Sequence, residues 1–283
     1  PAIVDTFSEQ ASVSANVAKK LGLTPGIPVS YRAGDQPNNA FSLNVLEPGE
    51  VAANAGTSGV VYGIGDKPLP DKQSRVNSFA HVNHTHEQNR LGVLLCINGT
   101  GILNSWLRRN IATGMSYPEM NDVALKAPVG AGGLLIYPFG NGAERVLENA
   151  NPGAEIKALN FNIHNQSHVL RAAQEGIAYS FRYGVDIMHN MGIEAKVVRA
   201  GKTNMFLSPL FRQTMSNVID AKIELYDTDG ALGAARGAAI GANLYSSPLE
   251  AFSQLTCLEQ ITPDGDQQKV LEVYEDWKNK LEF

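Results

Sequence analysis

The chain has 283 residues, of which 43% are hydrophobic and 18% are charged, and its formal net charge is −5 at pH 7. This composition excludes a disordered chain, and together with 27 glycines it favours a compact α/β protein over a coiled coil. The negative charge, without any Lys/Arg cluster, argues against nucleic acid as a partner. It does not exclude an anionic ligand, because backbone amides bind phosphate without a basic patch.

Neither a signal peptide nor an apolar run of membrane-spanning length is present, so we expect a cytoplasmic protein without a membrane partner. Cys96 and Cys257 lie far apart in the sequence, which is typical of reduced, buried thiols in a cytosolic protein. The chain begins at Pro1 and runs at once into polar residues 8–10. We therefore expect it to be an excised domain of a longer protein.

The first third of the chain predicts a helix, a strand and a second helix. Apolar spacing indicates a helix over residues 13–21, a strand over 27–30 and a helix over 39–45. Gly34 allows a sharp turn, so Asp35 is expected at the carboxyl end of the strand, where open α/β sheets bind ligands. The alternative is that Asp35 is only the N-cap of the helix that follows.

Two further strands are joined by a glycine-flanked turn. Residues 51–55 and 60–63 surround Gly56, Thr57 and Ser58, and this pattern is typical of a β-hairpin. The tip of such a hairpin carries clustered amides and hydroxyls. It can be purely structural, or it can hold phosphate groups.

The remaining segments alternate between strands and helices. We expect strands at 77–81, 91–97, 134–138, 196–199 and 223–226, and helices at 102–109, 167–191, 208–219, 229–242 and 267–281. Hairpin strands followed by βαβα units predict an α/β fold with all strands in one mixed sheet. No internal repeat or low-complexity linker is present, so one domain is the simplest interpretation.

Three glycine-marked turns end predicted strands, at residues 34–36, 56–59 and 200–202. A carboxylate and two open turns that meet across a sheet crevice suit phosphoryl transfer. In that reaction a base orients a hydroxyl nucleophile while amides hold the phosphates. The chain has no Walker A motif and no G-x-G-x-x-G after a strand.

His81, His84 and His86 form a His-x-x-His-x-His cluster that Glu87 could complete as a zinc site. Zinc would require a defined scaffold for these ligands. In a polar loop between strands, solvated or hydrogen-bonded histidines are the preferred interpretation. We therefore predict no metal site built from the protein's own side chains.

Several stretches occur in the order in which one known family carries them. They are 34–40 (Gly-Asp-Gln-Pro-Asn-Asn-Ala), 47–50 (Glu-Pro-Gly-Glu), 56–59 (Gly-Thr-Ser-Gly), 138–145, 199–201 (Arg-Ala-Gly), 208–213 and 229–235. In this order they resemble the FGGY carbohydrate kinases, and among them the xylulokinases most closely. The resemblance extends over essentially the whole chain.

The resemblance implies a ribonuclease H-like ATPase domain of the actin and hexokinase type, with a mixed five-stranded sheet flanked by helices. Residues 1–283 would be the C-terminal domain of such a kinase. Its partner would be its own N-terminal domain, which in the family carries an Asp-x-Gly-Thr phosphate loop and much of the sugar site. A homodimer is a further expectation.

The activity implied is ATP- and Mg²⁺-dependent phosphorylation of a ketopentose, D-xylulose to xylulose 5-phosphate, by the full-length enzyme, with this chain alone inactive. Two alternatives stay open. Another family substrate, namely ribulose, gluconate or glycerol, could replace xylulose. The chain could also be a kinase-fold module that binds a nucleotide or a protein partner without catalysing a reaction.

Site residues follow from the same resemblance. Asp35 would be the general base that takes the proton of the sugar hydroxyl, and Asp35 and Gln36 would contact the sugar. The implied nucleotide contacts are Gly56, Thr57 and Ser58 around the phosphates, and Gly201, Asn204 and Ser208 beside the adenosine. Two departures from the family pattern alter the adenosine turn: alanine at position 200 and an insertion at 202–207.

Overall fold

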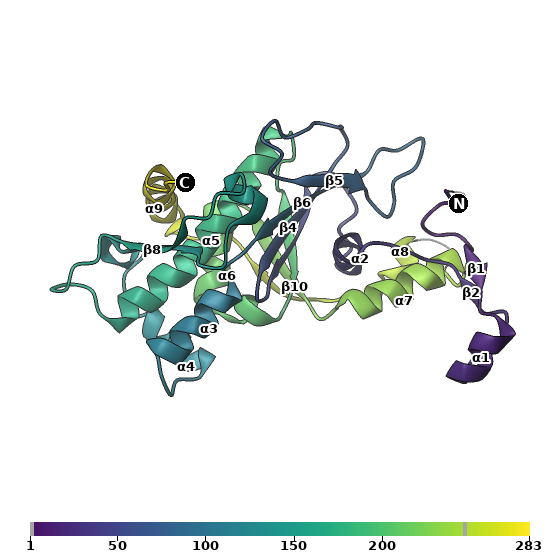
Figure 1. Cartoon of the computed structure of the whole chain (residues 1–283), viewed down its shortest axis with the longest axis horizontal. Coiled ribbons are helices and arrows are strands. Elements are labelled where there is room, and N and C mark those ends of the chain that lie inside the picture. Colours follow the sequence, from purple (N-terminus) through teal and green to yellow (C-terminus); the bar gives the residue numbers. More distant parts are fainter. Residues whose placement is uncertain (1–2, 246–247) are drawn as a thin grey trace.

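A seven-stranded mixed sheet forms the centre of the computed structural model, which describes residues 3–245 and 248–283 (Figure 1). In spatial order its strands are β11 (Cys257–Ile261), β10 (Lys222–Tyr226), β9 (Val197–Gly201), β3 (Glu50–Ala55), β4 (Gly59–Gly65), β6 (Leu91–Ile97) and β5 (Asn77–Ala80). The expected α/β class is confirmed. The sheet has two strands more than the five expected, and its edge strands are β11 and β5.

The hairpin at the centre of the sheet is confirmed. β3 pairs antiparallel with β4, with Ala55 opposite Gly59, so residues 56–58 form the connecting turn. On its other side β3 pairs in parallel with β9. The carboxyl ends of β3 and β9 therefore lie at the same end of the sheet as the turn.

Two expected strands lie outside this sheet. β7 (Leu135–Phe139) pairs only with β8 (Gly153–Lys157), and β2 (Pro28–Val29) pairs only with β1 (Ala11–Ser12). The prediction that all strands share one sheet is therefore wrong. Both β2 and β7 contain a proline, which has no amide to donate to a sheet ladder, and this favours small or edge pairings.

Three helices lie on one side of the large sheet: two contact its strands, and the third, the last in the chain, packs on those two. They are α5 (Gln166–Asn190), α6 (Pro209–Ile219) and α9 (Gln267–Asn279), and each was expected within a few residues. Phe181, Phe211 and Trp277 from these helices are fully buried in one cluster with Val51 and Leu95 of the sheet. This cluster is the main hydrophobic core.

The opposite face is covered by α2 (Asp35–Ser42), against which α7 (Gly230–Gly241) packs. The contact between these two helices is unusually close. A Cβ atom at Gly233 would lie 2.8 Å from the Cβ of Ser42, and one at Gly237 would lie 2.6 Å from the Tyr31 ring. Glycine at these positions lets α7 lie directly on α2 and the segment before it.

Smaller helices complete the chain: α1 (Ala15–Leu21), α3 (Gly101–Asn110), α4 (Tyr117–Ala124) and α8 (Pro248–Ala251), with 3₁₀ turns at Ala131–Gly133, Glu144–Leu147 and Asn204–Leu207. Figure 1 shows α3 and α4 beside one end of the sheet, and β1, α1 and β2 projecting from the other side of the molecule. Within residues 3–245 and 248–283, no helix combines the length and apolarity needed to cross a membrane.

Both cysteines are free thiols. They are half-buried, whereas we expected buried side chains. Cys257 begins the edge strand β11, and Cys96 lies near the end of β6, where the sheet meets the candidate site. Their positions at the margins of the sheet explain the difference.

Candidate active site

The turn between β3 and β4 is fixed by contacts to the start of α3. The carbonyl oxygen of Gly56 accepts hydrogen bonds from the amide of Gly101 and from the Thr100 hydroxyl, both at 2.8 Å. The carbonyl of Thr57 accepts from the amide of Ile102 and from the same hydroxyl, each at 3.2 Å. Thr100 is completely buried, so the turn and the helix form one unit.

The amides of the same turn are left unused. Across residues 3–245 and 248–283, the backbone N–H groups of Gly56, Thr57 and Ser58 donate to no protein acceptor. Consecutive free amides in a turn form a concave site suited to an anion. The arrangement can therefore bind phosphate oxygens without any lysine or arginine.

A cavity of about 880 Å³ borders this turn. Its lining includes Gly56, Thr57, Gly101, Asn104, Ser105, Arg109, Tyr117, Asn121, Asp122, Asn204, Leu207 and Ser208. Four of the expected nucleotide contacts are thus brought together, two from the turn and two from the segment before α6. Ser58 and Gly201 are not among the described residues that line the cavity.

The segment expected at the adenosine has a defined local structure. Gly201 is the last residue of β9, and its carbonyl accepts the amide of Thr203 at 2.8 Å, so the chain turns tightly directly after the strand. Asn204 adopts a left-handed backbone with φ of 52°. The Cβ that Gly56 lacks would lie 3.8 Å from Nδ2 of Asn204. Ser208 is the N-cap of α6, and its hydroxyl accepts from the amide of Phe211 at 3.3 Å.

Asp35 is the first residue of α2, and its side chain is exposed. Its carboxylate accepts the backbone amide of Gln36 at 2.8 Å and the side-chain amide of the same residue at 3.4 Å. These bonds leave lone pairs free to accept a proton from a ligand. The helix N-cap is Gly34, so the interpretation of Asp35 as the N-cap is wrong.

Asp35 lies near the end of the sheet that carries the turn. Burial, together with the negative charges of Glu144 and Asp35, raises the pKa of the Cys96 thiol. Cys96 pairs with Val60, which lies two residues beyond the turn. Asn38, one helical turn after Asp35, donates to the carbonyl of Gly230 at 2.7 Å, four residues past the carboxyl end of β10, which lies at the same end of the sheet as the turn. The preceding strand β2 does not belong to the large sheet, so Asp35 does not occupy one of that sheet's strand ends as expected.

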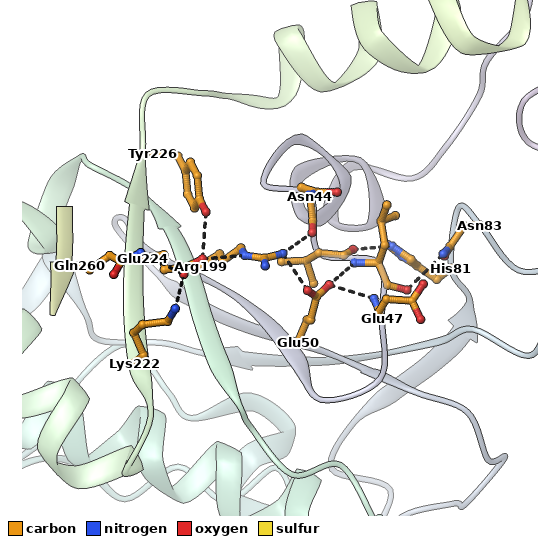
Figure 2. A network of polar contacts seen from close by, with 12 residues as sticks. Asn44, Glu47, Glu50, His81, Asn83, Arg199, Lys222, Glu224, Tyr226 and Gln260 are labelled. Atoms are coloured by element: carbon orange, nitrogen blue, oxygen red, sulfur yellow. Dashed lines mark hydrogen bonds and ion pairs between the residues drawn. The ribbon is translucent and has the colours of Figure 1, made fainter. Parts of the chain in front are cut away.

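The far end of α2 is anchored to the sheet through Arg199 (Figure 2). Its guanidinium forms ion pairs with Glu50 at 2.9 Å and Glu224 at 3.0 Å, and it donates to the carbonyl of Asn44 just beyond the helix. Glu50 in turn accepts the backbone amides of residues 46–47 at 2.7 and 2.9 Å. This network fixes the segment that follows α2.

Opposing effects also set the pKa of Glu224, the second carboxylate of the network. Burial raises the pKa of Glu224, but hydrogen bonds from Lys222, Arg199 and Tyr226 outweigh it and hold the pKa below its ordinary value. Sequence reasoning considered Arg199 only as a neighbour of the adenosine turn. The structure gives it a positioning role beneath α2 instead.

His81 belongs to the same anchor and not to a metal centre. Its Nε2 donates to the carbonyl of Val45 at 3.0 Å, so its Nδ1 must accept from the Tyr62 hydroxyl at 2.9 Å. Burial lowers the pKa of His81 to about 4, which keeps the ring neutral. Among residues 3–245 and 248–283, no cluster of three or more His, Cys, Asp or Glu side chains could hold a metal ion.

Sequence reasoning missed the wall of the cavity formed by α4. Its residues Tyr117 and Asn121 line the cavity, as does Asn104 of α3. A signal for α4 was present, because Ser116 and Glu119 form a capping box at its start. The polar lining residues themselves have no recognisable local motif.

Comparison with known proteins shows to which family this fold and this site belong. Residues 51–244 match the model of the FGGY family of carbohydrate kinases, C-terminal domain. This match starts after Asp35. It covers the turn, the residues that line the cavity, and helices α5 and α6 of the main hydrophobic core.

Curated relatives extend the similarity toward both ends. A xylulose kinase of Haemophilus influenzae is 26% identical over 86% of this chain and 47% of its own length. A gluconokinase of Bacillus subtilis is 28% identical over 74% of this chain and 42% of its own length. The chain thus spans about half the length of the curated relatives it matches.

A solved structure shows the same fold. The xylulose kinase of Rhodospirillum rubrum superposes with a TM-score of 0.86 and 23% sequence identity. The superposition covers 99% of this chain and 56% of that one. This chain therefore has the same fold as about half of that xylulose kinase.

Proposed function

The chain belongs to the FGGY family of carbohydrate kinases, and we propose that it is the nucleotide-binding and base-carrying C-terminal domain of an ATP-dependent ketopentose kinase. In this proposal residues 1–283 form one domain, and a second domain of the same protein supplies the other wall of the site. The full-length enzyme would convert D-xylulose to xylulose 5-phosphate. Similarity to several xylulose kinases supports the choice of substrate.

The turn at Gly56, Thr57 and Ser58 is the observation that carries the proposal. Its carbonyls are bonded to α3 and its amides are free, so it offers donors to an anion at the mouth of a cavity. A volume of about 880 Å³ lies within the range of pockets that hold small-molecule ligands and cofactors. The turn would bind the phosphates of ATP while the cavity holds the nucleoside.

Asp35 supplies the complementary chemistry. Its exposed carboxylate would accept the proton of a sugar hydroxyl as the hydroxyl oxygen attacks the γ-phosphorus, and the bond to the ADP oxygen breaks. Such a base must lie within hydrogen-bond reach of the hydroxyl in the assembled site. Gln36 would contact the sugar beside it, and the amides of the turn would stabilise charge on the phosphates.

Mg²⁺ would enter with the nucleotide. This ion is usually held by substrate phosphates with one or two protein oxygens, so no dedicated cage of side chains is needed. The hydroxyls of Thr57 and Ser58 are the candidate protein ligands, and they fit the hard oxygen chemistry that the ion requires. When bound, Mg²⁺ neutralises charge on the transferring phosphate.

Gluconate is the second candidate substrate. The gluconokinase of Bacillus subtilis is 28% identical to this chain, against 26% for the xylulose kinase of Haemophilus influenzae, but the xylulose kinase of Escherichia coli is also 28% identical and covers 94% of this chain against 74%. The sugar-selecting residues would lie largely in the second domain. The difference in identity therefore does not outweigh the larger coverage by xylulose kinases.

A coupled assay of ADP release tests the proposal. The full-length protein would be assayed with Mg-ATP against D-xylulose, ribulose, gluconate and glycerol, and the 283-residue chain would be assayed in parallel. We expect turnover on D-xylulose by the full-length protein and none by the chain. A full-length protein inert toward all four substrates would contradict the kinase assignment, and turnover by the chain alone would contradict the need for a second domain.

A further inference from the structure

The two-stranded sheet of β7 and β8 has an open edge. It lies on the opposite side of the molecule from α1 (Figure 1). Within residues 3–245 and 248–283, β8 pairs with β7 alone. The other edge of β8 is therefore available to a further strand, and such an edge is a ready template for pairing with another chain.

The contacts of β7 show which backbone groups of β8 point to this edge. The indole N–H of Trp277 donates to the carbonyl of Ile136 at 3.0 Å, so this carbonyl points away from β8. Pro138, two residues later, has no amide to donate to β8. Ile156 and Ala154 lie opposite these two residues. Because opposite residues in an antiparallel ladder are of one bonding type, the N–H and C=O groups of Ala154 and Ile156 face the open edge.

The order of side chains along β8 suits pairing with an identical strand. A twofold axis at Ile156 would place this residue opposite its own copy and Glu155 opposite Lys157 of the second copy, twice. Opposite charges in such cross-strand positions stabilise the pairing, and like charges destabilise it. An axis at Glu155 or at Lys157 would bring like charges together. An axis at Ala154 would place Pro152, which has no amide, at a bonding position.

Both charged side chains remain available to a second copy. The side chains of Glu155 and Lys157 are 37% and 25% exposed. Within the chain, Nζ of Lys157 lies 2.7 Å from the carbonyl oxygen of Lys280 and 3.2 Å from the Glu155 carboxylate. The carboxylate of Glu282, at 3.7 Å, is beyond hydrogen-bond distance. An ammonium group has three donors, so one is left for a further carboxylate.

Apolar side chains beside β8 enlarge the contact surface. The side chain of Ile156 is exposed, and the strand ends before Ala158, which adopts a left-handed backbone with φ of 62°. In the loop that follows, Leu159, Phe161 and Ile163 are also exposed, Phe161 to 90%. A ladder as short as β8 is marginal in water without burial of apolar surface. Exposed apolar groups gathered in this way mark interaction sites on soluble proteins.

We propose that the full-length protein forms a twofold homodimer in which the β8 strands of two copies pair antiparallel about Ile156. The two hairpins then join into one four-stranded sheet. Two Glu155–Lys157 pairs set its register, and the loops at 159–163 bury apolar surface beside it. The dimer does not depend on the proposed kinase activity, because none of the described residues of 153–163 lines the nucleotide cavity.

Sedimentation velocity of the full-length protein over a range of concentrations tests this pairing. We expect the wild type to sediment as a dimer. Glu155→Lys would bring two pairs of lysines together across the axis, and Lys157→Glu would bring together two pairs of glutamates. Each variant should therefore dimerise about 100-fold more weakly. The double variant Glu155→Lys/Lys157→Glu restores opposite charges and should dimerise within about threefold of the wild type.

A mixture of the two single variants is the sharpest test of the register. In a mixed dimer both cross-strand pairs again have opposite charges, so fluorescently labelled Glu155→Lys should become dimeric when Lys157→Glu is added. This recovery also shows that both variants are folded. Lys269→Glu, at an exposed lysine of α9, is the control and should dimerise like the wild type. A monomeric wild type, single variants as dimeric as the wild type, or a mixture that stays monomeric would overturn the inference.

Discussion

At its carboxyl end α2 is tied to the sheet by half-buried and buried side chains, whereas at its amino end the Asp35 carboxylate is exposed and bonded only to Gln36. The anchored end involves Arg199, Glu50 and His81, which bind backbone groups of residues 44–47. The comparison shows how a helix can hold a solvated carboxylate in a fixed place. The polar anchor lies at one end and the packing of α7 holds the helix along its length, while the reactive group remains accessible at the amino end.

Asp35→Asn in the full-length protein should have the largest effect on turnover, and it alters only the amino end of α2. Loss of a positioned general base should lower turnover by about 10²- to 10⁴-fold. ADP affinity, measured by calorimetry, should stay within about twofold, because the phosphate turn is a separate element. Asp66→Asn, at an exposed carboxylate in a loop, is the control and should have normal turnover. Turnover within a few-fold of wild type would show that Asp35 is not the base.

Arg199→Met breaks the anchored end. It removes the guanidinium that Glu50 and Glu224 share in a poorly solvated site. Glu50 keeps only backbone amides and Glu224 keeps Lys222 and Tyr226, so the free energy of unfolding should fall by about 3 kcal/mol. Urea unfolding of the 283-residue chain measures this loss. Lys269→Met, which removes an exposed ion pair with Glu272, should cost less than about 0.5 kcal/mol. Equal effects of the two substitutions would show that the Arg199 network does not anchor α2.

His81 makes the anchored end sensitive to pH. The folded state lowers its pKa to about 4, below the unfolded value near 6.5, so the unfolded chain binds a proton first. The stabilisation is complete above pH 6.5 and declines as the pH falls toward 4, by roughly 3 kcal/mol at most. Unfolding of wild type and His81→Gln at several pH values measures the difference. If the wild type loses no more stability than the variant between pH 6.5 and 4, His81 is not responsible.

Gly237→Ala tests the packing that sets the direction of α2. The added methyl group would lie 2.6 Å from the Tyr31 ring, so the free energy of unfolding should fall by about 1 to 2 kcal/mol. Thermal unfolding of the chain provides the measurement. Gly265→Ala, which adds a methyl group into open space, is the matched control and should be nearly neutral. A neutral result at Gly237 would mean that Tyr31 moves freely and does not fix the helix.

Local sequence patterns predicted the parts of the site that depend on local geometry. The hairpin and its turn at 56–58 follow from glycine spacing, and the cap at Ser208 follows from the proline after it. The place of Asn121 in the cavity wall could not be found in this way. Its orientation depends on Gln174, which is 53 residues away in the chain.

The pairing of the strands likewise could not be predicted from local sequence patterns. Residues 134–138 and 27–30 have strand character, and both form strands. Each contains a proline, which argues against a central position in a sheet, but a proline alone does not identify the strand with which each one pairs. Likewise, the sequence placed Arg199 only at the end of a strand, beside the expected adenosine turn. Its partners come from β3 and β10, which meet β9 only in the folded chain.

The contact between Gly101 and the turn also affects the protein when no nucleotide is bound. A Cβ at Gly101 would lie 2.5 Å from the carbonyl oxygen of Gly56, so the two backbones touch where any other residue would separate them. The amide hydrogens of Gly101 and Ile102 should therefore exchange slowly with solvent even without a nucleotide. A phosphate would then meet a turn that is already shaped for it, and binding would lose little free energy to ordering the loop.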